Sequence, residues 1–187
     1  MARRISLREF QQNLSTRLGS AQRGESSRAL LGISSGHGED SLWLFDLIDS
    51  GEVAPLTTLT PAPLTKNWFA GLANIRGALY GVVDFSVLRG GEATPLNADA
   101  RLLLIGTRHG MNSALLVSRT LGLFAPESLT LTNTAIADCA TAAAPWRGNR
   151  YVDGAGAHWT RLRIPALLSD PGFLDIAEVA LSSVATV

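Results

Sequence analysis

The stretch Trp68-Phe-Ala-Gly-Leu-Ala-Asn-Ile-Arg-Gly-Ala-Leu-Tyr-Gly-Val-Val-Asp-Phe85 decides how the rest of the chain is interpreted. Its second half, residues 78–85, is rich in strand-forming residues and follows a glycine, which is typical of a strand. Its first half ends on Asn-Ile-Arg-Gly at positions 74–77. A turn here would hold the Arg76 guanidinium at the rim of a buried strand. That position suits binding, and no nucleophile, base or metal ligand set beside it in the sequence indicates catalysis.

Apolar runs on both sides of this stretch predict further strands. The run at 101–105 is continuous and short, which indicates a strand buried on both faces. Turn-forming residues separate the runs into pairs, which is typical of hairpins. The predicted pairs are 28–34 with 41–48, 101–105 with 113–120, and 151–156 with 157–164.

Two long segments are predicted to be irregular. Three prolines interrupt residues 51–64, so we expect a connection that cannot be a central strand. Residues 125–150 have weak periodicity and contain Thr, Ala and Pro. They predict a long loop with one short helix around 134–143.

Helices are predicted at the two ends of the chain. Ser6 and Glu9 have the spacing of a capping box, and an apolar stripe runs through residues 6–21. This helix either packs on the body of the molecule or docks on a partner. Near the C-terminus, Asp170 stands at an N-cap position before Pro171, which predicts a terminal helix. The two apolar faces consist of Leu7, Phe10, Leu14 and Leu18, and of Phe173, Ile176, Ala177, Ala180, Leu181 and Val184.

These elements together predict a mainly β domain with a helix at each end. A chain of 187 residues has the size of one domain with a substantial core. The expected organisation is an N-terminal helix and linker at 1–27, a β domain at 28–168, and a C-terminal helix packed on that domain at 169–187.

The composition excludes several classes of function. Lys and Arg number 16, as do Asp and Glu, so no basic field attracts nucleic acid. Charged residues make up 17%, below the roughly 25% of an average soluble domain, which suits a protein that covers part of its surface with partners. The lone cysteine, Cys139, forbids an intramolecular disulfide, and no run approaches 18 apolar residues. We therefore expect a cytoplasmic protein without direct membrane insertion.

A small enzyme is the main alternative from the residues alone. Residues 32–36 fit the G-x-S-x-G pattern of a hydrolase, but a β pattern follows where that motif requires a helix. A carboxylate–histidine pair could perform acid–base chemistry, although no spacing brings the candidates together. These candidates are Asp84, Asp153, His109 and His158. The three histidines fit no zinc pattern, and a ligand-binding β-barrel sensor is a third alternative that no polar cluster supports.

The stretch quoted above resembles the CheW-like family of signalling adaptors. That family carries a G-x-x-N-[LIV]-R-G pattern, followed by an apolar strand that ends in V-[VI]-D-[LF]. The corresponding residues are Gly71-Leu-Ala-Asn74-Ile75-Arg76-Gly77 and Val82-Val83-Asp84-Phe85. The strand at 151–154 resembles the family's final hairpin, and the resemblance extends over about residues 28–168.

The resemblance implies both a fold and a function. The implied fold is two packed SH3-like five-stranded β-barrels that share a core, with N- and C-terminal helices. The implied function is that of a non-enzymatic adaptor without cofactor or metal. Such an adaptor couples the cytoplasmic tip of a methyl-accepting chemoreceptor to the regulatory domain of a CheA-like histidine kinase. The implied partner-binding residues are Gly71, Asn74, Ile75, Arg76, Gly77 and Asp84.

The two ends of the chain resemble one branch of this family in particular. The tail at 170–177 and the N-terminal helix resemble the PilI-type branch, which is linked to type IV pilus twitching motility. An adaptor of a flagellar-type chemotaxis array is the alternative. Either adaptor would be cytoplasmic and recruited to membrane-bound receptor arrays. Gly81, where many members have Pro, and Ser118, where the family has Asp, depart from the pattern and concern partner contacts more than the fold.

Overall fold

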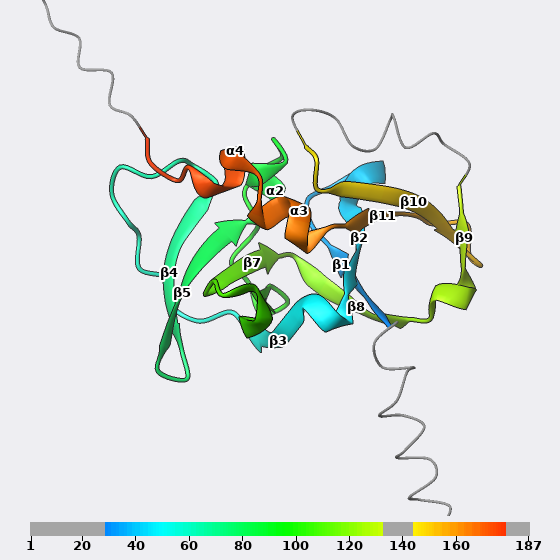
Figure 1. Ribbon diagram of the computed structural model, residues 1–187, viewed down its shortest axis with the longest axis horizontal. Helices are drawn as coiled ribbons and strands as arrows, with labels where there is room; N and C mark the ends of the chain where they lie inside the picture. Colours follow the sequence, from blue (N-terminus) through cyan, green and yellow to red (C-terminus); the bar gives the residue numbers. More distant parts are fainter. Residues whose placement is uncertain (1–28, 133–143, 179–187) are drawn as a thin grey trace, which may run out of the picture.

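The computed structural model describes residues 29–132 and 144–178. The predicted helices at 6–21 and 134–143, and the last part of the predicted C-terminal helix, lie outside these residues. The described chain is mainly β, as the sequence predicts. Its strands form two sheets that lie side by side (Figure 1).

The first sheet contains six strands among the described residues. They are β1 Leu30–Ser34, β2 Leu42–Asp46, β8 Arg119–Phe124, β9 Leu129–Leu131, β10 Arg147–Asp153 and β11 His158–Leu162. Their order across the sheet is β8-β1-β2-β11-β10-β9. β11 and β2 run parallel, whereas the other neighbours are antiparallel. The sheet curls so that its ribbons form a ring in Figure 1.

The second sheet contains five strands among the described residues. They are β3 Ser50–Pro55, β4 Phe69–Ile75, β5 Ala78–Asp84, β6 Arg101–Ile105 and β7 Ser113–Val117. Their order is β3-β6-β7-β5-β4, and here β5 and β7 are the parallel pair. All three predicted hairpin pairings are present, because β1 pairs with β2, β6 with β7, and β10 with β11.

The segment 113–120, predicted as one strand, is divided between the two sheets. β7 ends at Val117, and the backbone N–H of Ser118 donates to the carbonyl of Ser34 in the six-stranded sheet. The chain then continues as β8 beside β1. This crossing and the short strand β9 explain why one sheet has six strands and not the expected five.

Two further strands correct the sequence prediction. Residues 68–75 were expected to form the approach to a turn, but Phe69–Ile75 is a full strand, and only Arg76 and Gly77 form the turn. Residues 50–55 also form a strand, although 51–64 was expected to be irregular throughout. β3 ends at Pro55 and lies at an edge of its sheet, where a missing N–H breaks no ladder.

The largest cluster of buried side chains joins the two sheets. Its members from the six-stranded sheet include Ile33, Trp43, Phe45 and Leu162, and those from the five-stranded sheet include Val83, Leu103, Ile105 and Leu115. Each sheet also has a smaller apolar cluster of its own. The shared core that the resemblance implies is therefore present.

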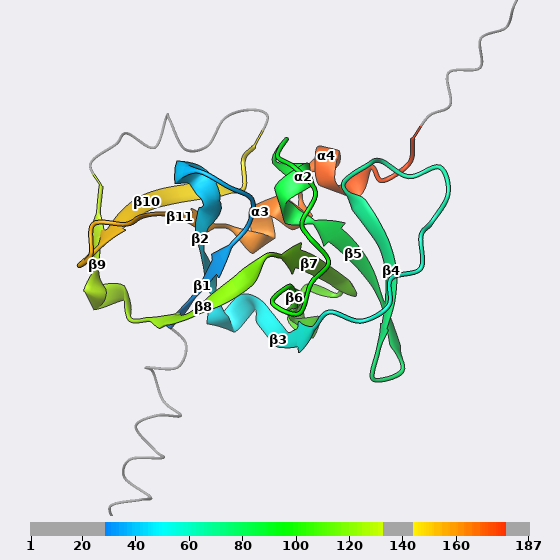
Figure 2. The same cartoon turned by 180° about the vertical axis from the view of Figure 1, so that it is seen from behind.

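The three α-helices of residues 29–132 and 144–178 lie together along the junction of the sheets in Figures 1 and 2. They are α2 Phe85–Leu88, α3 Ile164–Leu168 and α4 Pro171–Leu174. The short 3-10 helices are η2 Glu39–Ser41, η3 Leu47–Asp49, η4 Thr107–His109 and η5 Pro126–Ser128.

The predicted C-terminal helix is much shorter than expected within the described residues. Asp170 caps α4 as predicted, with Pro171 at its start, and Phe173 stacks on Trp68 at a ring-centroid distance of 6.1 Å. The helix stops at Leu174, and the backbone beyond it pairs with residues 64–66. These main-chain hydrogen bonds replace the helical ones, so the expected helical continuation through 175–178 was wrong.

Candidate functional site

Five of the six residues implied in partner binding lie on β4 and in the turn that follows it, and the sixth, Asp84, is the last residue of β5. Arg76 and Gly77 form its two-residue turn, with φ of 53° and 84°. Positive φ at both positions matches the right-handed twist of the two strands, and glycine adopts it without steric cost. The side-chain oxygen of Asn74 accepts a hydrogen bond from the Gly77 N–H at 2.9 Å, which closes the turn.

The Arg76 side chain is 78% exposed. Its Nη2 lies 2.8 Å from Oε1 of Glu52 on β3. Because β3 and β4 are the two edges of the five-stranded sheet, this ion pair connects its first edge to the hairpin at its other edge. Asp84 is not in contact with Arg76.

Gly71 and Ile75 act within the sheet. Gly71 has φ of 126° at a register shift between β4 and β5, and a Cβ there would approach the Thr60 carbonyl oxygen to 2.4 Å. The flanking Leu72 exchanges two backbone hydrogen bonds of 2.8 Å with Thr60. Ile75 is half-buried against the apolar cluster of the five-stranded sheet. Gly71 and Ile75 therefore support the hairpin from within the sheet.

Asp84 lies at the far end of β5 from Arg76, and it is buried. Its carboxylate accepts hydrogen bonds from the backbone N–H groups of Ser86 and Val87, which caps α2. It also accepts from the N–H of Thr94 at 2.7 Å and from its hydroxyl at 2.8 Å. Eight residues of extended chain separate Asp84 from Arg76, or roughly 25 Å. The fold therefore does not bring Asp84 together with the hairpin residues.

A second arginine, Arg89, follows α2 and joins the two sheets. Its guanidinium donates to the main-chain carbonyls of Asp40 and Ser35, which belong to the connection between β1 and β2. The group also lies over the rings of Trp43, 4.9 Å from the centroid, and Phe85, 5.3 Å from the centroid. Sequence reasoning missed this residue, because Ser35 and Arg89 are 54 positions apart and no motif connects them.

Arg147, on the six-stranded sheet, also lies against Trp43. Its guanidinium carbon is 5.4 Å from the centroid of Trp43 and 5.8 Å from that of Trp146. Burial, and next the positive charge of Arg147, lower the pKa of Arg89 to about 10. Arg89 stays charged at neutral pH, but its charge is less well solvated than that of an exposed arginine.

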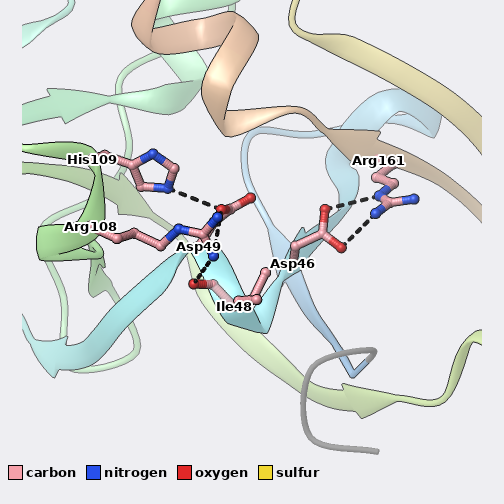
Figure 3. A network of polar contacts seen from close by, with 6 residues as sticks. All are labelled: Asp46, Ile48, Asp49, Arg108, His109 and Arg161. Atoms are coloured by element: carbon pink, nitrogen blue, oxygen red, sulfur yellow. Dashed lines mark hydrogen bonds and ion pairs between the residues drawn. The ribbon is translucent and has the colours of Figure 1, made fainter. Parts of the chain in front are cut away.

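A carboxylate–histidine pair lies where β2 continues through η3 into β3 (Figure 3). Asp49 is 6% exposed, and its Oδ1 lies 3.0 Å from Nε2 of His109 on η4. Nη1 of Arg108 is 3.9 Å from the same oxygen. These contacts tie the chain between the two sheets to the β6–β7 connection, which is a structural role.

Close to it, Asp46 at the end of β2 forms a two-fold hydrogen bond with Arg161 on β11 (Figure 3). The Nε–O and Nη2–O distances are 3.0 and 2.7 Å. These bonds raise the pKa of Arg161 above its ordinary value. The pair reinforces the parallel contact between β2 and β11.

The residues proposed for an enzymatic alternative do not assemble into a site. Asp153 accepts hydrogen bonds from Nε1 of Trp159 and from the N–H groups of Ala155 and Ala157, which closes the β10–β11 turn. The bond from Trp159, and next that from Ala157, lower the pKa of Asp153. His158 is exposed, and His109 pairs with Asp49 and not with Asp84 or Asp153. In the described ranges no cluster of His, Cys, Asp and Glu has the arrangement of a metal site.

Comparison with known proteins identifies the family. The model of the CheW-like domain matches residues 39–169, which is more than half of the chain. The solved structure of the scaffolding protein TtCheW from Thermoanaerobacter tengcongensis is similar in fold, with a TM-score of 0.57 at 17% sequence identity; the match covers 73% of this chain and 88% of that one. No curated protein matches the chain.

Among the residues that the structure describes, no helix is both long and apolar enough to cross a membrane. The two mixed sheets, the shared core and the family match agree with one another. The chain therefore belongs to the CheW-like domain family, whose members are scaffolding adaptors of chemotaxis signalling and not enzymes.

Proposed function

We propose that this protein couples the cytoplasmic tip of a methyl-accepting chemoreceptor to the regulatory domain of a CheA-like histidine kinase. The observation that carries the proposal is the position of Arg76, which extends 78% exposed from the tip of a hairpin in a chain of the CheW-like family. Arginine is enriched at binding hot spots, because its planar guanidinium offers several donors and is weakly hydrated.

The hairpin lowers the entropy that is lost when Arg76 becomes part of an interface. The turn is closed by the Asn74–Gly77 hydrogen bond, and the side chain is already held by Glu52 on β3. A side chain that is ordered before binding loses less entropy when a partner immobilises it. Arg76 is thus presented in a defined position while most of its surface is free for contacts.

The other implied residues divide into two groups. Asn74 and Gly77 are exposed beside Arg76 and belong with it to the proposed contact surface, and half-buried Ile75 supports it. Gly71 and Asp84 contribute through the backbone that they hold in place. In this proposal a change at Gly71 would weaken binding only by displacing the hairpin.

The first test is the variant Arg76→Glu, measured for folding and for binding to a kinase regulatory domain and to a receptor tip. We expect a melting temperature within about 2–4 °C of the wild type, since the residue is exposed and one surface ion pair is worth at most about 1 kcal/mol. We expect affinity for at least one partner to fall at least about thirtyfold, the effect of losing a hot spot of about 2 kcal/mol.

A charge-exchanged variant separates an interface role from a structural one. Glu52→Arg combined with Arg76→Glu restores an ion pair between the same two positions but moves the guanidinium to β3. If Arg76 contacts the partner, the double variant should bind as poorly as Arg76→Glu. Recovery of full affinity would instead assign Arg76 to holding the sheet edges together, and undiminished binding of both variants would end the proposal.

The proposed setting is the control of type IV pilus twitching motility. The observation that favours this branch is the tail at 170–177, which resembles the PilI-type pattern and in which Phe173 packs on Trp68. The protein would act in the cytoplasm and be recruited to membrane-bound receptor arrays. Deletion of its coding sequence should abolish twitching and leave swimming intact, whereas loss of swimming chemotaxis alone would assign it to a flagellar-type array.

A further inference from the structure

A hollow on the opposite end of β5 from Arg76 has no role in the proposed adaptor contacts. It has a volume of about 470 Å³ and lies between α2 and the β1–β2 connection, so both sheets contribute to it. The residues that matter here are Gly36, Asp40, Ser86, Arg89, Gly91 and Arg147. We refer to it as the Arg89 hollow.

Two cations in this hollow lie over the same cluster of aromatic rings. Trp43, Phe85 and Trp146 are buried and lie within 5.0–5.8 Å of one another, measured between ring centroids. The guanidinium groups of Arg89 and Arg147 both lie over this cluster. The rings favour the cations through their negative faces, but they also exclude water that would otherwise screen one positive charge from the other.

Two polar groups in the wall of the hollow lack partners within the described part of the chain. Ser86 Oγ and Arg89 Nε are buried there without a hydrogen bond to any described residue. Gly36 and Gly91 flank the Ser86 hydroxyl so closely that a Cβ at either position would approach it to 2.9 or 2.7 Å. Buried groups of this kind are uncommon, because a buried polar group that makes no hydrogen bond destabilises the folded state.

The contacts of Arg89 leave its charge without a carboxylate partner among the described side chains. Its two terminal nitrogens donate to neutral main-chain carbonyls, those of Asp40 and Ser35. The Asp40 carboxylate instead contacts Arg150, and lies 3.8 Å from Arg147. A carboxylate bound by arginine gains charge-assisted hydrogen bonds that a neutral carbonyl does not provide.

The local charge sets the kind of anion that would fit. The lining holds Arg89 and Arg147 and the carboxylates of Asp40 and Glu92, so its own charges balance. Arg150, outside the lining, pairs with Asp40 and adds one positive charge, while the nearby carboxylate of Asp84 already accepts four hydrogen bonds of its own. One positive charge matches a monoanion such as a carboxylate. A dianionic phosphate would have to approach both acidic side chains with its second charge unpaired.

We propose that the Arg89 hollow binds one carboxylate group, held between the guanidinium groups of Arg89 and Arg147, with the Ser86 hydroxyl as an additional donor. The carboxylate comes from a small organic acid or from an acidic side chain of a protein partner, since both present the same planar group. Arg89 exchanges its contact with a neutral carbonyl for the incoming carboxylate, and its side chain turns enough to uncover Ser86. The ligand would then bridge the two sheets beside their shared core.

The test is an NMR titration of the full-length protein at constant ionic strength. The probes are acetate, an aspartate blocked at both its amino and carboxyl ends, and inorganic phosphate. The reporter is the indole N–H signal of Trp43, because this group donates to the Asp40 carbonyl at 2.9 Å and its ring lies under both arginines. The variants are Arg147→Gln, Arg147→Lys and, as a control, Arg101→Gln.

Arg101 is a control for loss of an arginine elsewhere in the molecule, because it lies on β6 and its side chain donates to the main-chain carbonyls of Ala98 and Ala100, outside the hollow. We expect a saturable shift with acetate and with blocked aspartate that Arg101→Gln retains. Arg147→Gln should weaken the affinity for both carboxylate probes at least about tenfold. The affinity of Arg147→Lys, which keeps the charge but not the planar guanidinium, should lie between those of wild type and Arg147→Gln. Tighter binding of blocked aspartate than of acetate would assign the site to a protein side chain, and the reverse order to a small acid.

Two results would overturn the proposal. One is a shift that grows linearly with every anion and is the same in wild type and Arg147→Gln, which would indicate an effect of ions in general. The other is tighter binding of phosphate than of either carboxylate probe. Unchanged dispersion of the remaining spectrum checks that the variants are folded, and none of these measurements depends on the proposed receptor and kinase contacts.

Discussion

Strand β5 has an arginine just beyond each end, and the two are held in opposite ways. Arg76 is 78% exposed and pairs with a single carboxylate, Glu52. Arg89 lies over two aromatic rings and donates to two main-chain carbonyls of the other sheet. One residue type thus serves as an exposed group at one end and as a connection between sheets at the other.

The difference follows from what surrounds each arginine. A two-residue turn at the edge of a sheet has few neighbours, so Arg76 can be ordered only by one long-range ion pair, which water and salt weaken. Arg89 is surrounded by groups that are themselves fixed in the shared core, such as Trp43 and Phe85. We therefore expect stability to depend on the Arg89 end of β5, and partner binding to depend on the Arg76 end.

The largest expected effect on stability comes from Asp84→Ala at the Arg89 end. This change removes the acceptor for three backbone N–H groups and the Thr94 hydroxyl in a buried position. We expect a loss of about 3 kcal/mol or more in the free energy of unfolding. The melting temperature should fall by roughly 6–12 °C.

Asp99→Ala is the control for this measurement, because Asp99 is exposed on the loop before β6 and should cost less than about 0.5 kcal/mol. Urea unfolding of the three proteins would decide the matter. Equal midpoints for Asp84→Ala and Asp99→Ala would show that the connection after β5 does not limit stability. The proposed difference between the Arg76 and Arg89 ends of β5 would then be wrong.

A matched pair of substitutions compares the two arginines directly. Arg89→Ala should cost about 2 kcal/mol, since it exposes the aromatic cluster beneath it and removes the side-chain donor to the Ser35 carbonyl, while the Asp40 carbonyl keeps the donor Trp43. Arg76→Ala should cost less than about 1 kcal/mol, the range of an exposed ion pair. Only the cost at Arg76 should diminish in high salt. Equal costs, or equal salt dependence, would contradict the assignment of the two ends.

The smallest expected effect is a pH-dependent one at the β10–β11 turn, where Asp153 resembles Asp84 but lies nearer the surface. The hydrogen bond from Trp159 lowers the pKa of Asp153 in the folded state. The ionised group therefore stabilises the fold above its unfolded pKa, and this contribution is lost as the pH falls through the lowered folded value. Asp153→Asn should be less stable than wild type at pH 7, by less than Asp84→Ala.

The difference between Asp153→Asn and wild type should shrink as the pH falls below about 4, where the unfolded carboxylate takes up its proton. Thermal melts of both proteins between pH 7 and pH 3 would measure it. A difference that stays constant with pH would mean that the turn depends on the shape of the side chain and not on its charge.

Much of the fold could be predicted from the sequence because the signals are local. The apolar run at 101–105 and its hairpin with 113–117 can each be recognised from a few neighbouring residues. The cap formed by Asp170 can be recognised in the same way. The strand β3 was missed because the three prolines of 51–64 suggested an irregular segment, whereas only Pro55 belongs to β3 and an edge position tolerates it. The C-terminal helix was overestimated because its apolar spacing competed with backbone pairing to residues 64–66.

The candidate site shows the same division. The sequence by itself determined the hairpin turn at Arg76 and Gly77, since a glycine there and Asn74 three positions before it set the local backbone. Only the tertiary structure decided that Arg76 meets Glu52, and that Asp84 is a buried cap far from the hairpin.

The tertiary structure alone also decided that Arg89 and Arg147 lie over Trp43. Their contacts join segments that are distant in the chain, and the contact of Arg89 also joins the two sheets. Such contacts depend on the order and register of all the strands between them, which no short pattern of residues encodes. Local backbone preference and apolar spacing therefore specified the strands and turns, whereas the choice of partner for each charged side chain required the packed sheets.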